Sequence, residues 1–361
     1  MKKYLSMLLC LLLLVGMLSG CGQQTVDSGD RITLNVYNWG QYISDGSDDC
    51  LDVIAAFEEA YPHIKVNYST YDSNEVMYTK LAGGGITVDV IIPSDYMIAR
   101  MIEENMLLEL NFDNIPNYQH IDDSFKNTVY DPENKYSVPY AWGTVGIIYN
   151  TKYVDEEDLT GWELLWNEKY DDKILMYDNS RDAFGIAQLM LGYSLNTTDE
   201  GELRACADLL AKQKPYVQQY VMDQIYDLME NEEAWIAPCY AGDYVVMAEE
   251  NENLAFYRPE TGFNLFIDAM CIPYCAQEKE AAELFINFLC EPEIAAGNME
   301  WIAYSTPLKL ETVADFMDPE ILEDPVAYPS QEEIAKGTSF NSLPAAVSRL
   351  MESLFLKARI S

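Results

Sequence analysis

The chain has 361 residues, of which 60 are Asp or Glu and 22 are Lys or Arg, so its formal net charge at pH 7 is −38. Binding to nucleic acid requires clustered Lys and Arg against the phosphates, so this balance excludes nucleic acid as an expected partner. The length exceeds the size at which a single hydrophobic core stops growing, which predicts two domains or lobes.

The N-terminus has the pattern of a lipoprotein signal. Lys2 and Lys3 precede an apolar run, residues 8–18, that is short for a membrane span. The run ends in Leu-Ser-Gly-Cys at residues 18–21, which is typical of a bacterial lipobox. The alternative is an ordinary secretory signal in which this Cys is incidental.

We expect residues 1–20 to be a signal peptide, Cys21 to be the lipidated mature N-terminus, and residues 21–30 to form a small, polar tether. These expectations place the protein outside the cytoplasm, lipid-anchored to the outer face of the bacterial cytoplasmic membrane. In a cell with an outer membrane, this space is the periplasm.

From residue 31 the sequence alternates strand-like and helix-like segments, which predicts an α/β fold with a mainly parallel sheet and covering helices. In chain order the first half predicts a strand at 32–36, a helix at 51–61, a strand at 64–68, a helix at 74–81, a strand at 88–92 and a helix that follows residues 93–95. Gly83, Gly84 and Gly85 end the second helix, since glycine accepts the left-handed turn of a helix end. No nucleotide-binding glycine motif accompanies them.

Residues 136–150 predict two short extended pieces joined at residues 142–144, as in a crossing between lobes. A second round of elements then follows: helix 161–166, strand 173–177, helices 181–195 and 202–213, strand 235–238, helix 242–250, strands 254–257 and 265–271, helix 278–289 and a closing amphipathic helix 342–357.

Loops at the ends of the predicted strands share one composition, an aromatic residue beside a small polar or acidic one. They are residues 39–42, 94–96, 240–243 and 266–268, together with residues 178–182 at a helix start. In open α/β sheets, ligands bind outside the carboxyl ends of the strands, where such loops converge. Aromatic walls with carboxylate ends suit a flexible alkyl ammonium, because methylenes pack on rings and ammonium groups gain cation–π attraction and charge-assisted hydrogen bonds.

Each of these residues also has a purely structural interpretation. Trp39 or Phe266 alone is more often a core residue, Asp178 is well placed as an N-cap, and Asp243 lies near a helix start. Only their combination, in this order, indicates a binding site.

Ordered motifs along the chain carry a resemblance to a known family. They are Tyr37-Asn38-Trp39, residues 68–81, residues 90–94 (V-I-I-P-S), residues 137–143 (S-V-P-Y-A-W-G), residues 191–194, residues 286–289 and residues 304–307. From Tyr37 to about Tyr304 the chain resembles the spermidine/putrescine-binding proteins of bacterial ABC transporters.

The resemblance implies a two-lobed periplasmic-binding-protein fold, type II-like, with the ligand in the cleft between the lobes. We expect one lobe to comprise residues 31–143 plus 267–313 and the other residues 144–266 plus 314–361. The crossings between lobes would fall near residues 142–145 and Asp268, with a third contact near Val313.

The resemblance also implies roles for individual positions. The ligand-binding residues carried over from it are Trp39, Gln41, Tyr42, Ser94, Tyr96, Asp182, Tyr240, Asp243, Phe266, Asp268 and Tyr304. Among them, Asp268 matches the main cleft carboxylate. The expected partners are a polyamine and the permease subunits of an ABC importer, and no cofactor or metal is expected.

Departures from the family pattern bear on the choice of polyamine. Asn179 stands where spermidine-preferring members carry an acid, Gln41 replaces an acid of some relatives, and Phe340 falls near a position where some have Gln. Asp243 matches the acid of the putrescine-preferring branch. The resemblance therefore implies a preference for putrescine over spermidine.

Three alternatives stay open. The first is a binding protein of the same fold whose ligand is a different cation, a sugar or an anion. An anion would require Arg in the cleft, and the candidate loops contain only Arg181. A lipid-anchored hydrolase with paired carboxylates such as Asp178 and Asp182 is another. A zinc site at Cys271 and Cys275 is a third, although no further ligand lies nearby.

Overall fold

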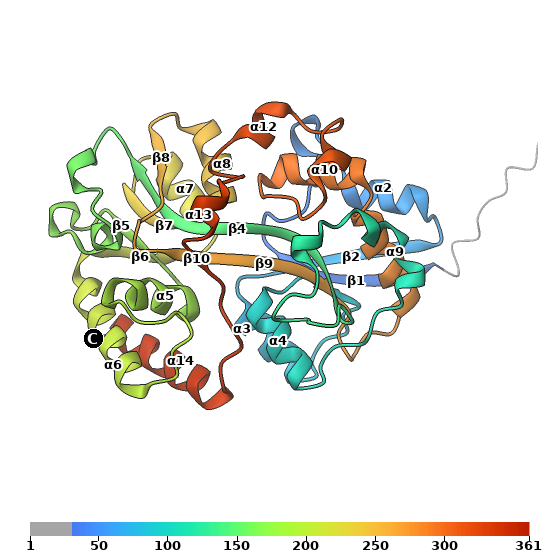
Figure 1. Cartoon of the computed structure of the whole chain (residues 1–361), viewed down its shortest axis with the longest axis horizontal. Helices are drawn as coiled ribbons and strands as arrows, with labels where there is room; N and C mark the ends of the chain where they lie inside the picture. Colours follow the sequence, from blue (N-terminus) through green and yellow to red (C-terminus); the bar gives the residue numbers. More distant parts are fainter. Residues whose placement is uncertain (1–30, 361) are drawn as a thin grey trace, which may run out of the picture. The chain divides into compact units, whose positions relative to one another are not determined.

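The computed structural model of the protein describes residues 31–360, and ten strands in this range belong to one sheet (Figure 1). The strands are β1 (Ile32–Trp39), β2 (Ile64–Tyr71), β3 (Val90–Ile91), β4 (Ser137–Asn150), β5 (Ile174–Tyr177), β6 (Val217–Val221), β7 (Ile236–Tyr240), β8 (Leu254–Tyr257), β9 (Phe263–Cys271) and β10 (Gly337–Thr338). Their order is β2-β1-β3-β9-β4-β7-β5-β6, with β8 paired to β4 and β10 paired to β9.

The sheet is mixed, so the expectation of a mainly parallel sheet is corrected. Strands β2 and β3 run parallel to β1, and strands β6 and β7 run parallel to β5. Between these two groups, β4 and β9 pair antiparallel with each other and with their neighbours β7 and β3. They are antiparallel because the chain passes from the first group to the second along β4 and returns along β9. Figure 1 shows them side by side between the two groups.

Strand β4 is continuous over 14 buried residues, whereas the sequence predicts two pieces joined at residues 142–144. Its residues up to Thr144 pair with β9, and from Val145 onward it pairs with β7. Gly143 does not make a turn here. A Cβ at this position would lie 2.8 Å from the ring of Phe266, so glycine permits close packing of the two strands.

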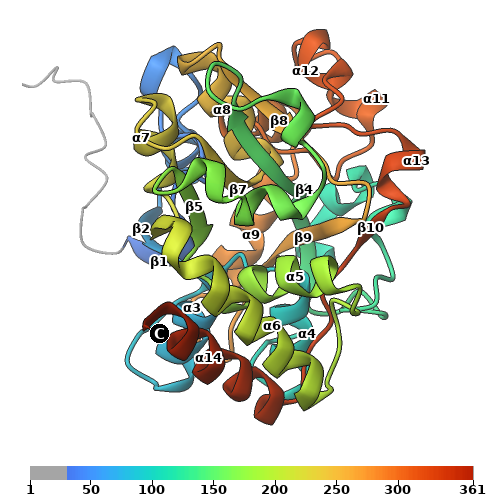
Figure 2. The same cartoon turned by 90° about the vertical axis from the view of Figure 1, so that its left-hand side faces the viewer.

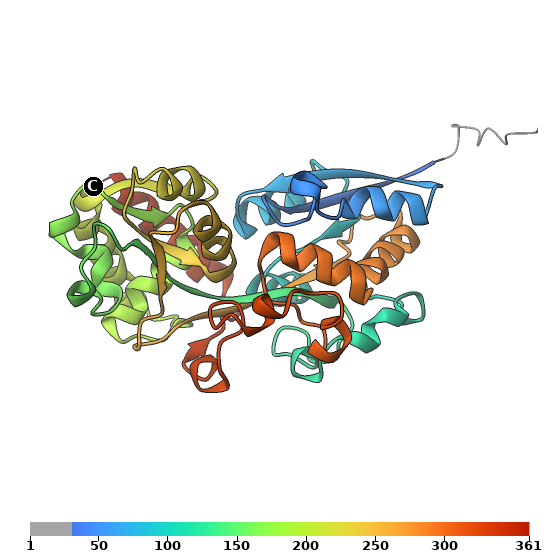
Figure 3. The ribbon, with the colours of Figure 1, turned by 90° about the horizontal axis from the view of Figure 1, so that it is seen from above.

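The α-helices of residues 31–360 lie on both faces of the sheet (Figures 2 and 3). They are α2 (Val53–Ala60), α3 (Asn74–Ala82), α4 (Asp95–Glu103), α5 (Ser180–Leu191), α6 (Glu200–Gln213), α7 (Ile225–Glu230), α8 (Ala241–Glu250), α9 (Lys279–Leu289), α10 (Pro292–Ile302), α11 (Leu310–Val313), α12 (Pro319–Glu323), α13 (Gln331–Ile334) and α14 (Ala345–Ile360). The closing helix α14 packs against α5 and α6.

Several elements differ from the sequence-based expectation. Helix α5 ends at Leu191 instead of residue 195 because Gly192 adopts a left-handed conformation, with φ of 70°. The segment expected as a helix at 161–166 is a 3-10 helix, Trp162–Trp166. Strand β6 and helices α7 and α10 have no counterpart among the predicted elements.

The change of partner in β4 between Thr144 and Val145 lies where a crossing between lobes is expected. The full assignment of residues 31–143 plus 267–313 to one lobe and residues 144–266 plus 314–361 to the other stays a prediction. The lipidation expected at Cys21 and the signal peptide lie outside the described residues.

The described cysteines are free thiols. Cys206, Cys239, Cys271 and Cys290 are buried, and Cys50 and Cys275 are partly buried. Within residues 31–360 no group of three or more His, Cys, Asp or Glu side chains is arranged to hold a metal ion.

Candidate ligand-binding site

The carboxyl ends of both parallel groups of strands open onto one cavity. Trp39 ends β1, and Ser94 follows β3; in the second group Asp182 follows β5, and Tyr240 ends β7. Asp182 and Asp243 lie in the first turns of α5 and α8, where the partial positive charge of a helix N-terminus favours a carboxylate.

The cavity has a volume of about 80 Å³. Since each water-sized group needs about 10–15 Å³, the cavity has room for about six non-hydrogen groups of this size. Ten of the eleven residues expected to contact ligand line it: Trp39, Tyr42, Ser94, Tyr96, Asp182, Tyr240, Asp243, Phe266, Asp268 and Tyr304.

Gln41 is the exception, because it does not line the cavity. It is exposed and adopts a positive φ of 50° in the turn after β1. The turn at residues 40 and 41 leaves the Gln41 side chain exposed to solvent between the ring-bearing residues Trp39 and Tyr42.

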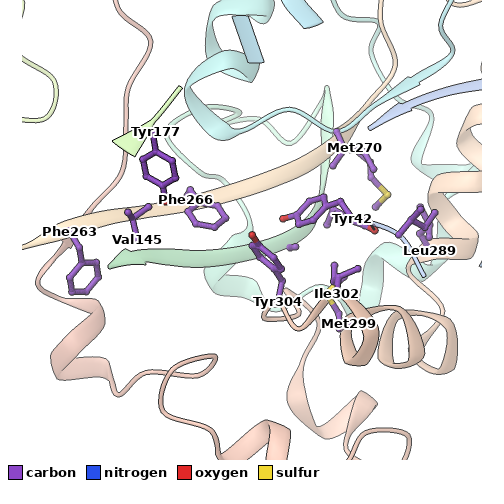
Figure 4. Close-up of a cluster of buried hydrophobic side chains, with 14 of the residues drawn as sticks. Tyr42, Val145, Tyr177, Phe263, Phe266, Met270, Leu289, Met299, Ile302 and Tyr304 are labelled. Atoms are coloured by element: carbon purple, nitrogen blue, oxygen red, sulfur yellow. Dashed lines mark hydrogen bonds between the residues drawn. The ribbon is translucent and has the colours of Figure 1, made fainter. Parts of the chain in front are cut away.

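The rings of Tyr42, Tyr304, Phe266 and Tyr240 follow one another in edge contacts, and Figure 4 shows the first three of them. The rings of Tyr42 and Tyr304 meet at 4.9 Å and 90°, and those of Tyr240 and Phe266 meet at 5.5 Å and 80°. Trp39 is held in place by a 2.8 Å hydrogen bond from its indole nitrogen to the carbonyl of Ile92. These rings provide apolar walls whose orientation is set by packing.

Asp268 lies on β9 and is only 5% exposed. The hydroxyl of Tyr42 donates a 2.7 Å hydrogen bond to its Oδ2, but no described residue donates to Oδ1 with hydrogen-bond geometry. Burial raises the pKa of Asp268 to about 6, against the nearby hydroxyls of Ser94 and Tyr42, which lower it. The side chain is therefore mostly a carboxylate at pH 7, with one unpartnered oxygen.

Asp182 has two donors on one oxygen. Tyr240 donates from its hydroxyl at 2.8 Å and Asn179 donates from its amide at 2.7 Å, both to Oδ2. Burial raises the pKa of Asp182 to about 7.

Asp243 repeats the same arrangement. The hydroxyls of Tyr304 and Tyr226 donate to its Oδ1 at 2.6 and 3.0 Å, and burial raises its pKa to about 6. No described residue donates to the second oxygen of Asp182 or Asp243. Each of the three acids thus has one oxygen that accepts no hydrogen bond from a described residue.

Ser94 and Tyr96 are fixed from behind by Asn74. Its amide nitrogen donates to the hydroxyls of Ser94 and Tyr96 at 3.0 and 3.1 Å, while the Tyr96 hydroxyl donates to Glu75 at 2.9 Å. The Tyr96 hydroxyl is therefore occupied, and its ring is the part free to face a ligand.

The sequence analysis missed several residues that line the cavity. They are Gly40, Asp72, Asn74, Asp95, Met222, Asp223, Tyr226 and Asn264; Asn179 and Phe340, noted above only as departures, line it as well. Asp223 and Tyr226 were missed because β6 and α7 were not predicted. Residues 220–223 (Y-V-M-D) do carry the composition of the other loops, an aromatic residue close to an acid.

The described residues that line the cavity include six Asp and no Lys, Arg or His. One of the six, Asp95, is 2% exposed, and burial raises its pKa well above the usual range. A cavity with carboxylates, aromatic walls and no cation of its own is arranged to receive a cation.

Comparison with known proteins identifies the family to which the chain belongs and individual proteins that resemble it. Residues 52–326 match the family model of bacterial extracellular solute-binding proteins, so the chain belongs to this family and acts outside the cytoplasm. The spermidine/putrescine-binding periplasmic protein of Escherichia coli is 32% identical over 94% of both chains, and the putrescine-binding periplasmic protein SpuD of Pseudomonas aeruginosa is 31% identical over 99% of both.

A solved structure from Listeria monocytogenes, provisionally described as a spermidine/putrescine ABC transporter, has a TM-score of 0.86 and 38% identity. The alignment covers 91% of this chain and 99% of that one. These matches confirm the two-lobed α/β fold and the family expected from the sequence. The relatives are named as binding proteins and a transporter, so they give no support to the hydrolase alternative. None of the helices in residues 31–360 has the length and apolar character needed to cross a membrane.

Proposed function

We propose that the protein binds a polyamine outside the cytoplasm and delivers it to the permease of an ABC importer. The observation that carries the proposal is the unpartnered Oδ1 of Asp268, which is buried in a cavity with Asp182 and Asp243 and without a described cation. A buried carboxylate is costly unless it is paired, and the described residues that line the cavity supply no positive charge, so a cationic ligand would supply it. The relatives named above as polyamine-binding proteins support the same assignment.

The three acids define where ammonium groups would bind. One ammonium meets Asp182, and the other meets Asp243 and Asp268, while the methylenes between them pack on Trp39, Tyr240 and the neighbouring rings. Each ammonium donates to the oxygen that the tyrosine hydroxyls leave free.

The inner cavity favours putrescine over spermidine. The volume of the whole cavity, about 80 Å³, is in keeping with a ligand as small as a diamine with four carbons between its two nitrogens. Asn179, rather than an acid, stands beside Asp182, so the inner part of the cavity offers no additional carboxylate for a third ammonium. Replacing Asn179 by Asp is therefore expected to improve the binding of spermidine more than that of putrescine.

The membrane attachment proposed here is a lipid on Cys21. It rests on the sequence pattern at residues 18–21. Replacing Cys21 by Ser should release the protein from the membrane fraction, and mass spectrometry of the wild-type N-terminal peptide should find a diacylglycerol adduct. An unmodified Cys21 in membrane-extracted protein would contradict the proposal.

Titration calorimetry on residues 22–361 tests the ligand class. Putrescine, spermidine, cadaverine and a neutral sugar form the panel, and we expect binding of one amine per protein, no binding of the sugar and putrescine binding at least as tight as that of spermidine. Binding of the sugar without the amines would favour the alternative cargo. Tenfold tighter binding of spermidine would contradict the diamine preference while leaving the polyamine class intact.

A further inference from the structure

Two exposed acids line the same cavity in addition to Asp182, Asp243 and Asp268, which we call the inner acids. Asp72 follows β2 in the first group of strands, and Asp223 follows β6 in the second. Both side chains line the cavity and are also exposed to solvent. They therefore lie at its mouth, where the interior meets bulk water.

The carboxylate of Asp223 lies against the loop that follows β1. A Cβ added to Gly40 would come within 2.2 Å of Oδ2 of Asp223, so the absence of a side chain at residue 40 makes room for this carboxylate. Since Gly40 and Asp223 come from different groups of strands, the contact spans the mouth of the cavity.

Neither outer carboxylate has a hydrogen-bond or ion-pair partner within residues 31–360. The pKa of Asp223 is raised, first because neighbouring protein displaces water from part of its surface and second because Asp72 is a nearby negative charge. Asp223 in turn contributes to the raised pKa of Asp243. The outer acids thus extend the negative field of the inner ones without a described cation to balance it.

Helix α7 connects the outer acids to the inner site. Asp223 lies just before this helix, and Tyr226 in its first turn donates to Asp243. The same short segment therefore positions an inner hydrogen-bond donor and an outer carboxylate. The outer pair is continuous with the cavity in which Oδ1 of buried Asp268 has no partner.

We propose that Asp72 and Asp223 form an outer subsite for one further ammonium group of a linear polyamine whose other ammonium groups occupy the inner acids. This proposal rests on the proposed function. A diamine pairs with the inner acids alone, whereas a triamine has one more ammonium group, which would reach the mouth, so Asp223 and Asp72 would determine how well the protein accepts the longer ligand. The inner acids favour the binding of a diamine, and the outer pair, Asp72 and Asp223, allows a triamine to bind as well.

The exposure of the outer pair sets the expected size of the effect. An ammonium at the mouth retains part of its hydration, so its desolvation penalty is small. The gain from pairing there is correspondingly modest, as for other exposed ion pairs, and it weakens as salt increases.

Titration calorimetry with putrescine and spermidine tests the subsite in Asp223→Asn and Asp72→Asn. Each variant should raise the ratio of the spermidine Kd to the putrescine Kd by about two- to fivefold at low salt, and less at high salt. The matched control is Asp227→Asn, which removes the same charge from an exposed position of α7 that does not line the cavity. It should leave the ratio unchanged.

The outcomes separate the subsite from the function on which it rests. If neither amine binds the wild type, the proposed function fails. If both amines bind and Asp223→Asn leaves their ratio unchanged, the outer subsite alone is wrong. If Asp223→Asn makes both amines bind more tightly by the same factor, the only effect of Asp72 and Asp223 is their mutual repulsion across the mouth, and the proposal is likewise overturned.

Discussion

The hydroxyl of Tyr42 donates a 2.7 Å hydrogen bond to Asp268, which lies 226 positions further along the chain. This bond occupies one carboxylate oxygen and leaves Oδ1 without a described partner. Asp268 is therefore fixed in orientation and keeps one oxygen unpaired, and under the proposed function it is the residue whose loss should matter most.

Replacing Asp268 by Asn should weaken putrescine binding by about 2–5 kcal/mol, because the ammonium it meets would be left buried without its charge partner. Gln41→Ala is the control, since Gln41 is exposed outside the cavity, and it should change the binding free energy by less than about 0.5 kcal/mol. Calorimetric titration of both variants measures the difference. Equal losses would place Asp268 outside the binding site.

Polyamine affinity should fall as the pH drops below about 7. The ligand binds the carboxylate forms, and in the empty protein the pKa of Asp182 is about 7 and those of Asp243 and Asp268 are about 6. Acidification therefore protonates the acids that the ligand needs, and binding should release protons between pH 5 and 7. Calorimetry in buffers of different ionisation enthalpy measures this release, and an affinity independent of pH over this range would argue against the assignment.

The same shifts predict how ligand-free stability depends on pH. A carboxyl whose pKa is higher in the folded than in the unfolded state contributes stability at low pH that is lost as the pH rises through its folded pKa. The contribution of Asp182 should therefore disappear between about pH 4 and 7. Thermal unfolding should show a larger ligand-induced increase in Tm at pH 8 than at pH 5.5, and Asp182→Asn should reduce this contrast.

Tyr240→Phe should weaken binding and shift its pH dependence upward. It keeps the aromatic ring but removes the 2.8 Å donor to Asp182, and this hydrogen bond lowers the pKa of that carboxyl. Hydrogen bonds to charged groups contribute about 1.5–3 kcal/mol.

Tyr177→Phe is the matched control for Tyr240→Phe. The two rings are 5.0 Å apart, but the buried Tyr177 hydroxyl has no partner within residues 31–360. Its removal should leave binding unchanged and leave the free energy of unfolding unchanged or slightly higher. A loss of stability above about 1 kcal/mol would mean that the hydroxyl is hydrogen-bonded after all.

Asn179→Ala should lower the free energy of unfolding by about 1 kcal/mol. The Asn179 side chain caps α5 by accepting a 2.8 Å hydrogen bond from the backbone nitrogen of Arg181. Asn179→Asp keeps an acceptor at the cap, so it should retain most of the stability while losing the donor to Asp182. Denaturant unfolding separates the two roles, and equal destabilisation in both variants would show that the cap is not the cause.

Putrescine should favour a closed arrangement of the lobes. The cavity takes residues from both groups of strands, so a ligand that contacts both has a higher affinity for the closed state than for an open one. Small-angle scattering of residues 22–361 should show a smaller radius of gyration at saturating putrescine. An unchanged scattering curve, with binding verified in the same sample, would contradict closure.

Local sequence patterns determined much of this protein. Alternation and helical periodicity located most strands and helices, and the pairing of aromatic residues with acids at strand ends located loops that meet at one cavity; the resemblance to the family implied the eleven ligand contacts, ten of which line that cavity. This was possible because the carboxyl ends of parallel strands meet at one edge of a sheet, so residues far apart in sequence share a place once their elements are recognised.

Only the tertiary structure decided how these residues act on one another. The hydrogen bond from Tyr42 to Asp268 joins residues 226 positions apart, and the one from Tyr304 to Asp243 joins residues 61 positions apart. The geometry of these bonds decides which oxygen of each carboxylate stays without a donor. Burial, which raises the pKa of these acids, is likewise a property of the packed fold. Asp223 stayed hidden because β6 lacks a regular alternation, and its contact with Gly40 arises only when the two groups of strands come together. The hydrophobic periodicity of a segment indicates which of its faces is buried, whereas the packing of the whole chain sets which distant segments are in contact.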